Sequence, residues 1–372
     1  MSFEVFELDN PKWTQVLKES EADIAFSPNF CRFHLRKSPG RAVMLFYEDD
    51  LGAIFDVTLL KDISSLPFFP STVGNDMFLN ALRSVVDSCQ SKPLLDLMSP
   101  GYNGPTLVGN PSNARDLLVR YRQSVDGWCQ EHNVITEFVR IHPMSTAVAL
   151  LDEIESLHKA SEVIYVDLRD GYDAAWENYS SKRRQEVRRA VRNGAAMRIV
   201  PSDELHIDRF VELYDSTMSR KQAKSVYFYS REFFIDLFDR LKEQTLLVEA
   251  YAGDQLASST IFFLGNRCVW AQYEGTVPSV RDSDANLYKT DRMIAWSADH
   301  SYNYFLLGGG FSEGDGGYQY KMRYSRLTAP VWHLKKVHNP ILLQALVDTK
   351  DAHDQVQGRP IRRDYFPSYW LT

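Results

Sequence analysis

The sequence predicts an α/β protein with two tandem domains, each a mixed, mainly antiparallel sheet flanked by helices. The chain has 372 residues, which is enough for two domains of ordinary size. Its composition, 44% hydrophobic and 13% aromatic, supplies apolar side chains for two cores. In addition, a hairpin, a strand, a helix and a further strand follow one another twice in the predicted order of elements. We therefore expect an N-terminal domain over residues 1–165 and a C-terminal domain over residues 166–372.

The C-terminal half shows the clearest succession of elements. Apolar residues recur at helical spacing in residues 205–220, after the candidate cap residues Ser202 and Asp203. Residues 252–255, Ala-Gly-Asp-Gln, read as a hairpin turn between two β-rich runs. The expected elements are strand 197–200, helices 205–220 and 231–241, strands 245–251, 256–264 and 267–273, helix 284–300, strand 304–307, and two more strands around 321–324 and 331–337.

The N-terminal half repeats part of this order. Its expected elements are strands 42–47, 51–59 and 93–98, helix 113–131, strand 135–141, a helical stretch at 150–157 and a linking strand at 165–168. The tail beyond residue 351 is first polar and then aromatic, with Tyr365, Phe366, Tyr369 and Trp370. We expect these aromatic side chains to pack back on the body of the protein.

The charge balance limits the classes of partner. Lys and Arg number 42 against 49 Asp and Glu, a net charge of −7, so the molecule as a whole does not attract nucleic acid or an anionic membrane. Any anion site must therefore be local. The one strongly basic stretch is residues 182–192, where helical spacing puts Arg184, Arg188 and Arg192 on one face. This face is either a solvated surface or a phosphate-facing helix for a nucleotide diphosphate or a tRNA stem.

The cysteines and the hydropathy argue for a reducing compartment. Cys31, Cys89, Cys129 and Cys268 are widely scattered, without the spacing of a zinc site or a disulfide framework, and are expected as buried thiols. We expect no metal. The N-terminus lacks the features of a signal peptide, and no window reaches the length of an apolar membrane span. A bacterial cytoplasmic location is the expectation.

Four motifs resemble one branch of a known superfamily. They are Ser-Pro-Gly-Tyr-Asn-Gly-Pro at 99–105, Val-Arg-Ile-His-Pro at 139–143, Thr-Met-Ser-Arg-Lys at 217–221, and Leu-Gly-Gly-Gly at 307–310 with Lys321 beyond it. In this order, and with this succession of elements, they look like the Fem-type (FemABX-like) branch of the GNAT acyltransferases. The resemblance covers roughly residues 93–337. It implies two GNAT-like domains and transfer of an acyl or aminoacyl group to an amine.

The resemblance leaves two donors open. In peptidoglycan bridge enzymes of this branch the donor is aminoacyl-tRNA and the acceptor a muropeptide, whereas related sugar-modifying members use acyl-CoA and an amino sugar on a nucleotide. The acidic chain and the lack of a long heptad-patterned helical hairpin favour acyl-CoA. Against it, residues 278–286 stand where the usual GNAT pyrophosphate loop, Gln/Arg-x-x-Gly-x-Gly/Ala, is expected.

The preferred interpretation is therefore an acyl-CoA-dependent N-acyltransferase that acts on a nucleotide-linked amino sugar for surface polysaccharide, such as lipopolysaccharide O-antigen or capsule. One alternative is an aminoacyl-tRNA-dependent enzyme acting on a peptidoglycan precursor; tRNA is the less favoured partner. The other alternative is a non-catalytic module that binds nucleotide sugars, which the missing pyrophosphate motif allows.

The candidate catalytic residues are Lys321, Glu274 and His142. By resemblance, Lys321 stabilises negative charge on the carbonyl oxygen during attack by the amine. Its plain alternative is a surface lysine. Glu274, at the end of the central strand, is the candidate base, with His142 and Asp315 behind it. A structural histidine is the ordinary interpretation of His142.

Further residues are assigned to binding. Arginine suits a diphosphate because its guanidinium matches paired phosphate oxygens, and tyrosine can stack on a base, although ion pairing and core packing are the structural alternatives. The expected substrate-binding residues are Tyr102, Asn103, Arg140, Arg184, Arg220 and Tyr227, and the expected cofactor-binding residues are Tyr273, Gly308, Gly309 and Gly310.

Overall fold

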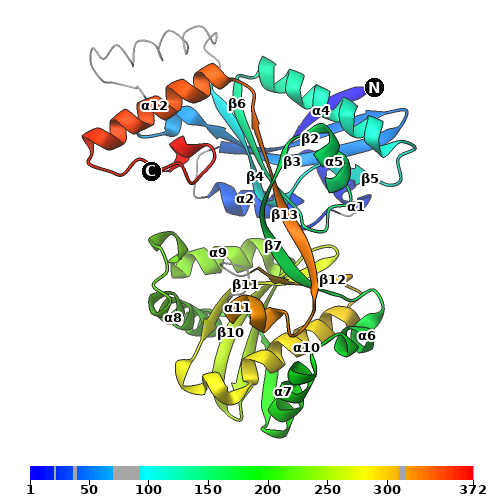
Figure 1. The fold of residues 1–372 in the computed structure, drawn as a ribbon, viewed down its shortest axis with the longest axis vertical. Helices are drawn as coiled ribbons and strands as arrows, with labels where there is room; N and C mark the ends of the chain where they lie inside the picture. The colour runs from blue at the N-terminus through cyan, green and yellow to red at the C-terminus, as the bar shows by residue number, and fades with distance from the viewer. Residues whose placement is uncertain (21, 37–39, 70–92, 310–315, 372) are drawn as a thin grey trace. The chain divides into compact units, whose positions relative to one another are not determined.

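The protein divides into two compact units. The structure, a computed structural model, describes all residues except 21, 37–39, 70–92, 310–315 and 372 (Figure 1). Unit 1 contains Met1–Ala160 and Val331–Thr372, and unit 2 contains Ser161–Pro330. The boundary expected at residue 165 lies close to the first border. The C-terminal segment differs from the expected division, because residues 331–372 pack within unit 1.

Unit 1 is a mixed sheet with helices on both faces. Its strands are β1 (Ser2–Glu7), β2 (Gly40–Asp49), β3 (Gly52–Asp62), β4 (Leu95–Asn103), β5 (Thr106–Val108), β6 (Val134–Ile141) and most of β13 (Leu327–Val337), and its helices are α1 (Pro11–Lys18), α2 (Pro28–Leu35), α4 (Ala114–Glu131), α5 (Val148–Ile154) and α12 (Pro340–Val356). The strand order is β1-β2-β3-β4-β6-β13, with β5 beside β3. Only β4 and β6 are parallel among these neighbours.

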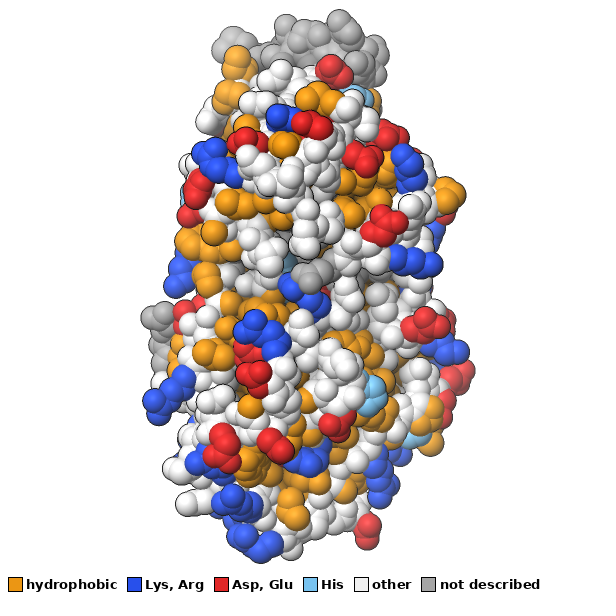
Figure 2. Space-filling model, turned by 90° about the vertical axis from the view of Figure 1, so that its right-hand side faces the viewer, with side chains coloured by type: hydrophobic (Ala, Val, Ile, Leu, Met, Phe, Trp, Pro, Cys, Tyr) orange, Lys and Arg blue, Asp and Glu red, His pale blue; other side chains and the backbone are white. Residues whose placement is uncertain are grey.

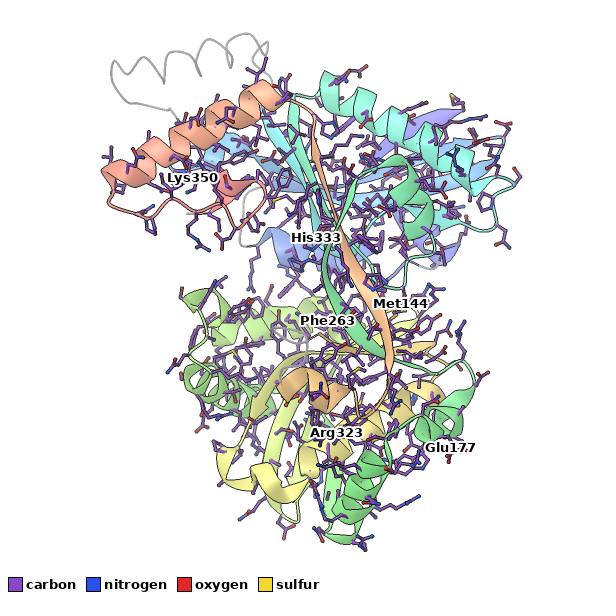
Figure 3. All side chains as sticks on the ribbon, viewed as in Figure 1. Met144, Glu177, Phe263, Arg323, His333 and Lys350 are labelled. Atoms are coloured by element: carbon purple, nitrogen blue, oxygen red, sulfur yellow. The ribbon has the colours of Figure 1, made fainter. Side chains whose placement is uncertain are left out.

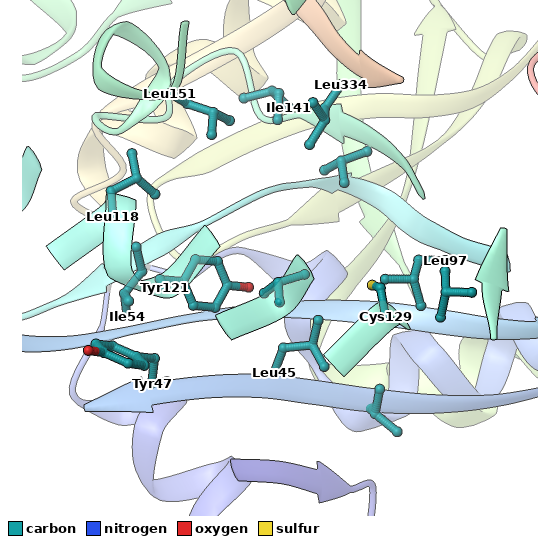
Figure 4. Close-up of a cluster of buried hydrophobic side chains, with 14 of the residues drawn as sticks. Leu45, Tyr47, Ile54, Leu97, Leu118, Tyr121, Cys129, Ile141, Leu151 and Leu334 are labelled. Carbon is teal, nitrogen blue, oxygen red and sulfur yellow. The ribbon is translucent and has the colours of Figure 1, made fainter. Parts of the chain in front are cut away.

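The alternation of side chains along β2 explains how unit 1 is layered. Val43, Leu45 and Tyr47 pack in one cluster with residues of α4 such as Leu117 and Tyr121 (Figure 4). The intervening Ala42, Met44 and Phe46 pack on the other face with side chains of α1 and α2, Trp13 and Cys31. Successive strand residues point to opposite faces, so a continuous apolar run needs cover on both. Each fully buried large side chain contributes roughly 1.5–3 kcal/mol.

Unit 2 repeats this design. Its elements are α6 (Gly171–Glu177), α7 (Ser181–Arg192), β8 (Ala195–Val200), α8 (Glu204–Arg220), α9 (Arg231–Leu241), β9 (Thr245–Ala252), β10 (Gln255–Leu264), β11 (Cys268–Thr276), α10 (Ala285–Asp299), β12 (Tyr304–Gly308), α11 (Gly316–Lys321) and the second half of β7 (Leu157–Asp167). The strand order is β8-β9-β10-β11-β12-β7, and among these neighbours only β11 and β12 are parallel.

The faces of the unit 2 sheet carry different kinds of core. On the side of α10, aliphatic and aromatic residues such as Val248, Phe305 and Met293 form one cluster. On the side of α8 and α9 the core is mainly aromatic, and Tyr273 of β11 makes edge-to-face contacts with Tyr214 and Phe234 at ring-centre distances of 6.0 and 5.5 Å. Edge-to-face contacts of this kind add about 0.5–1.5 kcal/mol per pair to the burial itself.

The two units have one topology, with their last strands exchanged. Strands β1, β2, β3, β4 and β6 correspond to β8, β9, β10, β11 and β12, and the parallel crossover helices α4 and α10 correspond as well. In chain order β7 follows β6 and β13 follows β12. Yet β6 pairs with β13, His333 opposite Arg140, and β12 pairs with β7, Tyr304 opposite Asp167. The internal duplication predicted from the sequence is thus present in the topology, and the fold class is confirmed.

Several expected details were wrong or missed. The strand expected around residues 321–324 is absent, because Lys321 ends helix α11 and the chain then turns. The elements β1, α1, α2, β5, α6, α11 and α12 were not predicted. The aromatic tail does pack back, as Tyr369 is fully buried. Cys31, Cys129 and Cys268 are buried, while Cys89 lies outside the described residues. In the described part of the chain, no helix has the length and apolarity needed to cross a membrane.

Candidate active site

The parallel strands at the centre of unit 2 diverge early. Strands β11 and β12 pair over three positions, from Cys268 opposite Tyr304 to Trp270 opposite Leu306. Beyond this point β11 continues to Thr276. The corresponding strands of unit 1, β4 and β6, are interrupted after Met98 opposite Phe138. They then pair again, from Tyr102 opposite Arg140 to Asn103 opposite Ile141. A divergence of this kind leaves backbone groups of β11 able to receive an extended ligand, and only unit 2 has it among the described strands.

The side chain of Lys321, the last residue of α11, reaches the end of β12. Its Nζ donates a hydrogen bond to the carbonyl oxygen of Gly309 at 2.5 Å. A Cβ on Gly309 would lie 2.5 Å from the carbonyl oxygen of Glu162, and Gly308 has a φ of 75°, so both positions require glycine for internal reasons. Tyr318 donates to the Glu162 carboxylate at 2.5 Å, which ties α11 to β7. Gly310 and the reserve base Asp315 lie outside the described residues, and cofactor binding by these glycines stays a prediction.

Arg183, for which the sequence predicts no role, supports the helix that carries Lys321. Its guanidinium is 1% exposed and lies 4.4 and 4.2 Å from the ring centres of Tyr320 and Tyr324. It donates to the carbonyl oxygen of Tyr320 at 3.0 Å and pairs with Glu186 at 3.1 Å. Arg323, which follows α11 (Figure 3), also pairs with Glu186. The only sign of its burial in the sequence is its position on α7, one helical turn before the buried residue Val187.

Glu274 lies on β11, past its pairing with β12, in a polar cluster. Its Oε1 accepts a hydrogen bond from Asn286 at 2.8 Å, and its Oε2 lies 3.4 Å from Nζ of Lys289. The Glu274 side chain is 36% exposed, whereas Lys289 is fully buried. Burial raises the pKa of Glu274, but Lys289 and Asn286 outweigh it and hold the pKa below its ordinary value. Glu274 is therefore ionised at neutral pH.

The entrance to α10 carries an acidic residue. Asp284 precedes the helix with a left-handed backbone, φ 62°, and its Oδ2 lies 2.5 Å from a guanidinium nitrogen of Arg189 on α7. A helix N-terminus holds phosphate through free N–H groups, and a carboxylate at this position repels a phosphate.

The predicted phosphate ligand Arg220 donates to Oγ1 of Thr276, the last residue of β11, at 2.7 Å. Arg220 thus lies beside the end of β11 within unit 2.

His142 and its expected neighbours belong to unit 1. Nε2 of His142 lies 3.0 Å from Oδ2 of Asp23, and Nδ1 accepts from the backbone N–H of Met144 at 3.0 Å. The hydrogen bond to Nδ1 and the nearby Asp23 carboxylate hold the ring within unit 1, which favours the structural interpretation of His142. Its ring lies edge-on to Tyr102. Exposed Arg140 lies 6.0 Å from the Tyr102 ring centre, so these two side chains are together.

The remaining predicted residues have internal partners. Asn103 is buried, donating to the carbonyl oxygen of Val57 and accepting from the N–H of Gly104. Arg184 donates to the carbonyl oxygens of Glu177 and Tyr179 and so caps α6. Tyr273 contributes its ring to the aromatic core. Tyr227 is half exposed. Substrate contacts by any of them stay predictions.

Part of the chain matches a known protein family. Residues 181–322 match the family described as an acetyltransferase (GNAT) domain. The match includes β11, β12, Glu274 and Lys321. This segment is therefore a GNAT-type acetyltransferase domain, and the expectation of an N-acyltransferase enzyme is confirmed. No curated protein matches the chain.

Solved structures share the fold over most of the chain. The crystal structure of FemX superposes with a TM-score of 0.66 at 11% identity, covering 92% of this chain and 99% of that one. A conserved protein of unknown function from Bacteroides thetaiotaomicron VPI-5482 gives 0.50 at 12% identity, covering 91% and 99%. A tandem GNAT protein from the clavulanic acid biosynthesis pathway gives 0.46 at 10% identity, covering 91% and 99%. At such identities the likeness is one of fold.

Proposed function

We propose that unit 2 forms an amide bond by transferring an activated acyl group to a primary amine. The observation that carries the proposal is the early divergence of β11 from β12, with Glu274 beyond it on β11 and Lys321 at the end of β12. The amine nitrogen attacks the acyl carbonyl carbon, and the bond from that carbon to the leaving oxygen or sulfur breaks. The leaving group takes up the proton that the amine gives up, so atoms and charge balance.

Lys321 is the proposed stabiliser of charge on the carbonyl oxygen. Its ammonium is a point charge held in place by the Gly309 carbonyl, and a fixed charge of this kind costs no reorganisation during the reaction. Ionised Glu274 is the proposed acceptor of the amine proton before that proton reaches the leaving group. Because its pKa is held low, Glu274 serves as a proton relay more than as a strong base.

For the donor we infer an aminoacyl ester of tRNA, and for the acceptor an amine of a peptidoglycan precursor. The FemX-like fold over nearly the whole chain supports this Fem-type interpretation. Asp284 supports it too, since its carboxylate stands at the helix end where a coenzyme A diphosphate would need N–H donors. The exposed cations Lys182, Arg188 and Arg192 of α7 offer a local contact for an RNA backbone.

Acylation of a nucleotide-linked amino sugar by acyl-CoA is the second candidate. The match to an acetyltransferase domain favours it. So does the charge of −7, because gripping tRNA takes a broad basic surface. On the face that Figure 2 draws, basic and acidic side chains are interspersed. The donor is therefore the point at which the two candidates separate.

The test is a paired donor assay. Purified protein is incubated with acyl-CoA thioesters or with aminoacyl-tRNA, each with a muropeptide precursor and with nucleotide-linked amino sugars, and products are read by mass spectrometry. The first candidate predicts amide product when aminoacyl-tRNA is the donor and none when acyl-CoA is the donor. Product from acyl-CoA with an amino sugar would establish the second. No amide from any combination, with protein shown to be folded, would contradict acyl transfer.

A further inference from the structure

The segment between α8 and α9 presents apolar side chains to solvent. Val226, Tyr227 and Phe228 are 65%, 50% and 42% exposed. They are consecutive in the sequence, whereas the other large apolar side chains exposed in the described part of the chain are separated from one another. Exposed apolar side chains gathered at one place, rather than scattered singly, mark an interaction site.

This exposure is built into the segment. The hydroxyl of Tyr214 donates to the carbonyl oxygen of Tyr227 at 2.9 Å, and the N–H of Phe228 donates to the carbonyl oxygen of Ser225 at 3.0 Å. The next residue, Tyr229, turns inward and stacks on Phe233 with ring centres 4.3 Å apart. The chain thus places one aromatic ring in the core and holds the three preceding side chains outside.

The same segment is basic. Residues 216–230 contain Arg220, Lys221 and Lys224 and no acidic residue. All three basic side chains are exposed. Aromatic and aliphatic tips flanked by lysines are the composition of a surface that lies in the headgroup region of an anionic bilayer. Each lysine near such a surface is attracted by the negative charge of the lipids, although the whole chain carries a net negative charge.

The segment also adjoins the proposed active site. Helix α8 packs so closely on β11 that a Cβ on Gly275 would lie 2.6 Å from the carbonyl carbon of Leu213. Arg220, at the end of α8, donates to Thr276, two residues beyond Glu274. The exposed segment begins at the next residue, Lys221. Whatever binds this segment is therefore brought to the end of β11.

We propose that residues 220–228 dock unit 2 on an anionic lipid surface. This docking does not depend on the proposed acyl transfer. Three apolar side chains are too few for a stable protein partner, because specific protein interfaces bury about 800 Å² on each side. A bilayer needs no such area, since insertion of a few side chains and a few charges suffices for reversible binding.

The test measures sedimentation of the full chain with vesicles, without donor or acceptor. Vesicles of 30% phosphatidylglycerol in phosphatidylcholine are compared with pure phosphatidylcholine, at low salt and at 0.5 M NaCl. The variant Val226→Ser/Phe228→Ser tests the apolar part, and Lys224→Gln tests the charge. The matched control is Ile341→Ser/Val356→Ser, which removes two side chains of unit 1 that are 72% and 84% exposed.

We expect binding to the anionic vesicles that weakens in salt. The serine pair should lower the partition coefficient by about tenfold or more, and Lys224→Gln by about fivefold, while the control pair changes nothing. Absence of binding by the wild-type chain, or equal binding by the serine pair and the wild type, would overturn the docking. An altered KM for a water-soluble acceptor in the serine pair, without vesicle binding, would assign the segment to acceptor contact instead.

Discussion

Glu274 and Lys289 show how burial and charge set the state of a single carboxylate. Lys289 is fully buried, and burial lowers its pKa, an effect that Glu274 partly offsets. Glu274 in turn keeps a pKa below its ordinary value because Lys289 and Asn286 outweigh burial. The pair is costly to break from the side of Glu274, because removal of this carboxylate leaves the charge of fully buried Lys289 without compensation.

The variant Lys289→Met should therefore raise the pKa of Glu274. Burial then acts without the opposing charge, so the acid limb of the kcat/KM profile should move to higher pH. The stabilisation that ionised Glu274 contributes is present above its unfolded pKa and lost as pH falls through its lower folded pKa. The stability deficit of the variant should hence be largest near neutral pH and shrink on acidification. An unchanged acid limb would exclude Glu274 from the rate-determining ionisation.

Asp56 in unit 1 leads to a second prediction, because its pKa is raised whereas that of Glu274 is lowered. Burial, and then the charge of Glu137, raise the pKa of Asp56 from 3.8 to about 8. Folding therefore binds a proton at this site, and its contribution to stability falls as pH rises from about 4 to about 8. The variant Asp56→Asn keeps an acceptor for the N–H groups of Val57 and Gly104 without a charge.

We expect Asp56→Asn to raise the thermal midpoint at pH 8 and to change it little at pH 4. The measurement is thermal unfolding by circular dichroism across this range. The control is Asp152→Asn, an exposed carboxylate on α5, which should leave the pH dependence as in the wild type. A difference between Asp56→Asn and the wild type that is the same at both pH values would contradict the assignment.

At the scale of elements, helix α11 depends on Arg183 of α7 for its position. The guanidinium lies between Tyr320 and Tyr324 and binds the Tyr320 carbonyl, next to Lys321. Arg183→Met should leave Glu186 with Arg323 as partner but release this carbonyl. We expect a loss of about 3 kcal/mol in stability, typical of breaking a buried pair, and a fall in kcat with KM nearly unchanged.

Arg183→Lys separates the two effects. A lysine keeps the charge beside Glu186 but cannot span two rings and a carbonyl with a planar group. Stability should therefore recover in part while kcat stays low. Recovery of both by lysine would show that charge alone matters at this position, and loss of stability without any change in kcat would make Arg183 purely structural.

The sequence predicts which helices and strands exist better than it predicts the surroundings of single residues. Strands β9 to β12 and helices α8 to α10 follow from period and turn signals, with small errors at their ends. Short helix α11 follows a glycine-rich run and has no period or turn signal of its own, and the strand expected around residues 321–324 begins only at its last residue. Arg183 stands in a run of cations that suggests a solvated face, so only tertiary packing reveals that it is buried. Asn103 likewise donates to the carbonyl oxygen of Val57, 46 residues away, which no local pattern reveals.

At the scale of the whole molecule, the exchange of β7 and β13 makes each unit depend on a strand distant in sequence. Local patterns identify these strands but say nothing of their partners, because pairing is decided by the assembled sheet. This is why the expected domains, 1–165 and 166–372, and the compact units differ at the C-terminus.

A fragment of residues 1–165 should accordingly fail to fold cooperatively. It lacks β13, which pairs with β6 from Thr136 to Arg140, and it lacks Tyr369 and Trp370, which donate hydrogen bonds to buried Asp96. Co-expression with residues 327–372 should restore a single unfolding transition, followed by circular dichroism in urea. Residues 327–372 with Tyr369→Phe should restore it less well. A cooperative transition of the fragment alone would contradict the structural importance of the exchange.

The central claim, that unit 2 holds an acyl-transfer site in which Lys321 stabilises the carbonyl oxygen, is tested most directly by the kinetics of Lys321→Ala and Lys321→Arg. Lys18→Ala, an exposed lysine of unit 1, is the control. With the donor and acceptor that the paired assay identifies, the alanine variant should lower kcat by about two to three powers of ten with KM nearly intact, and arginine should rescue little. Wild-type kcat in the alanine variant, or a loss confined to KM that arginine restores, would contradict the claim.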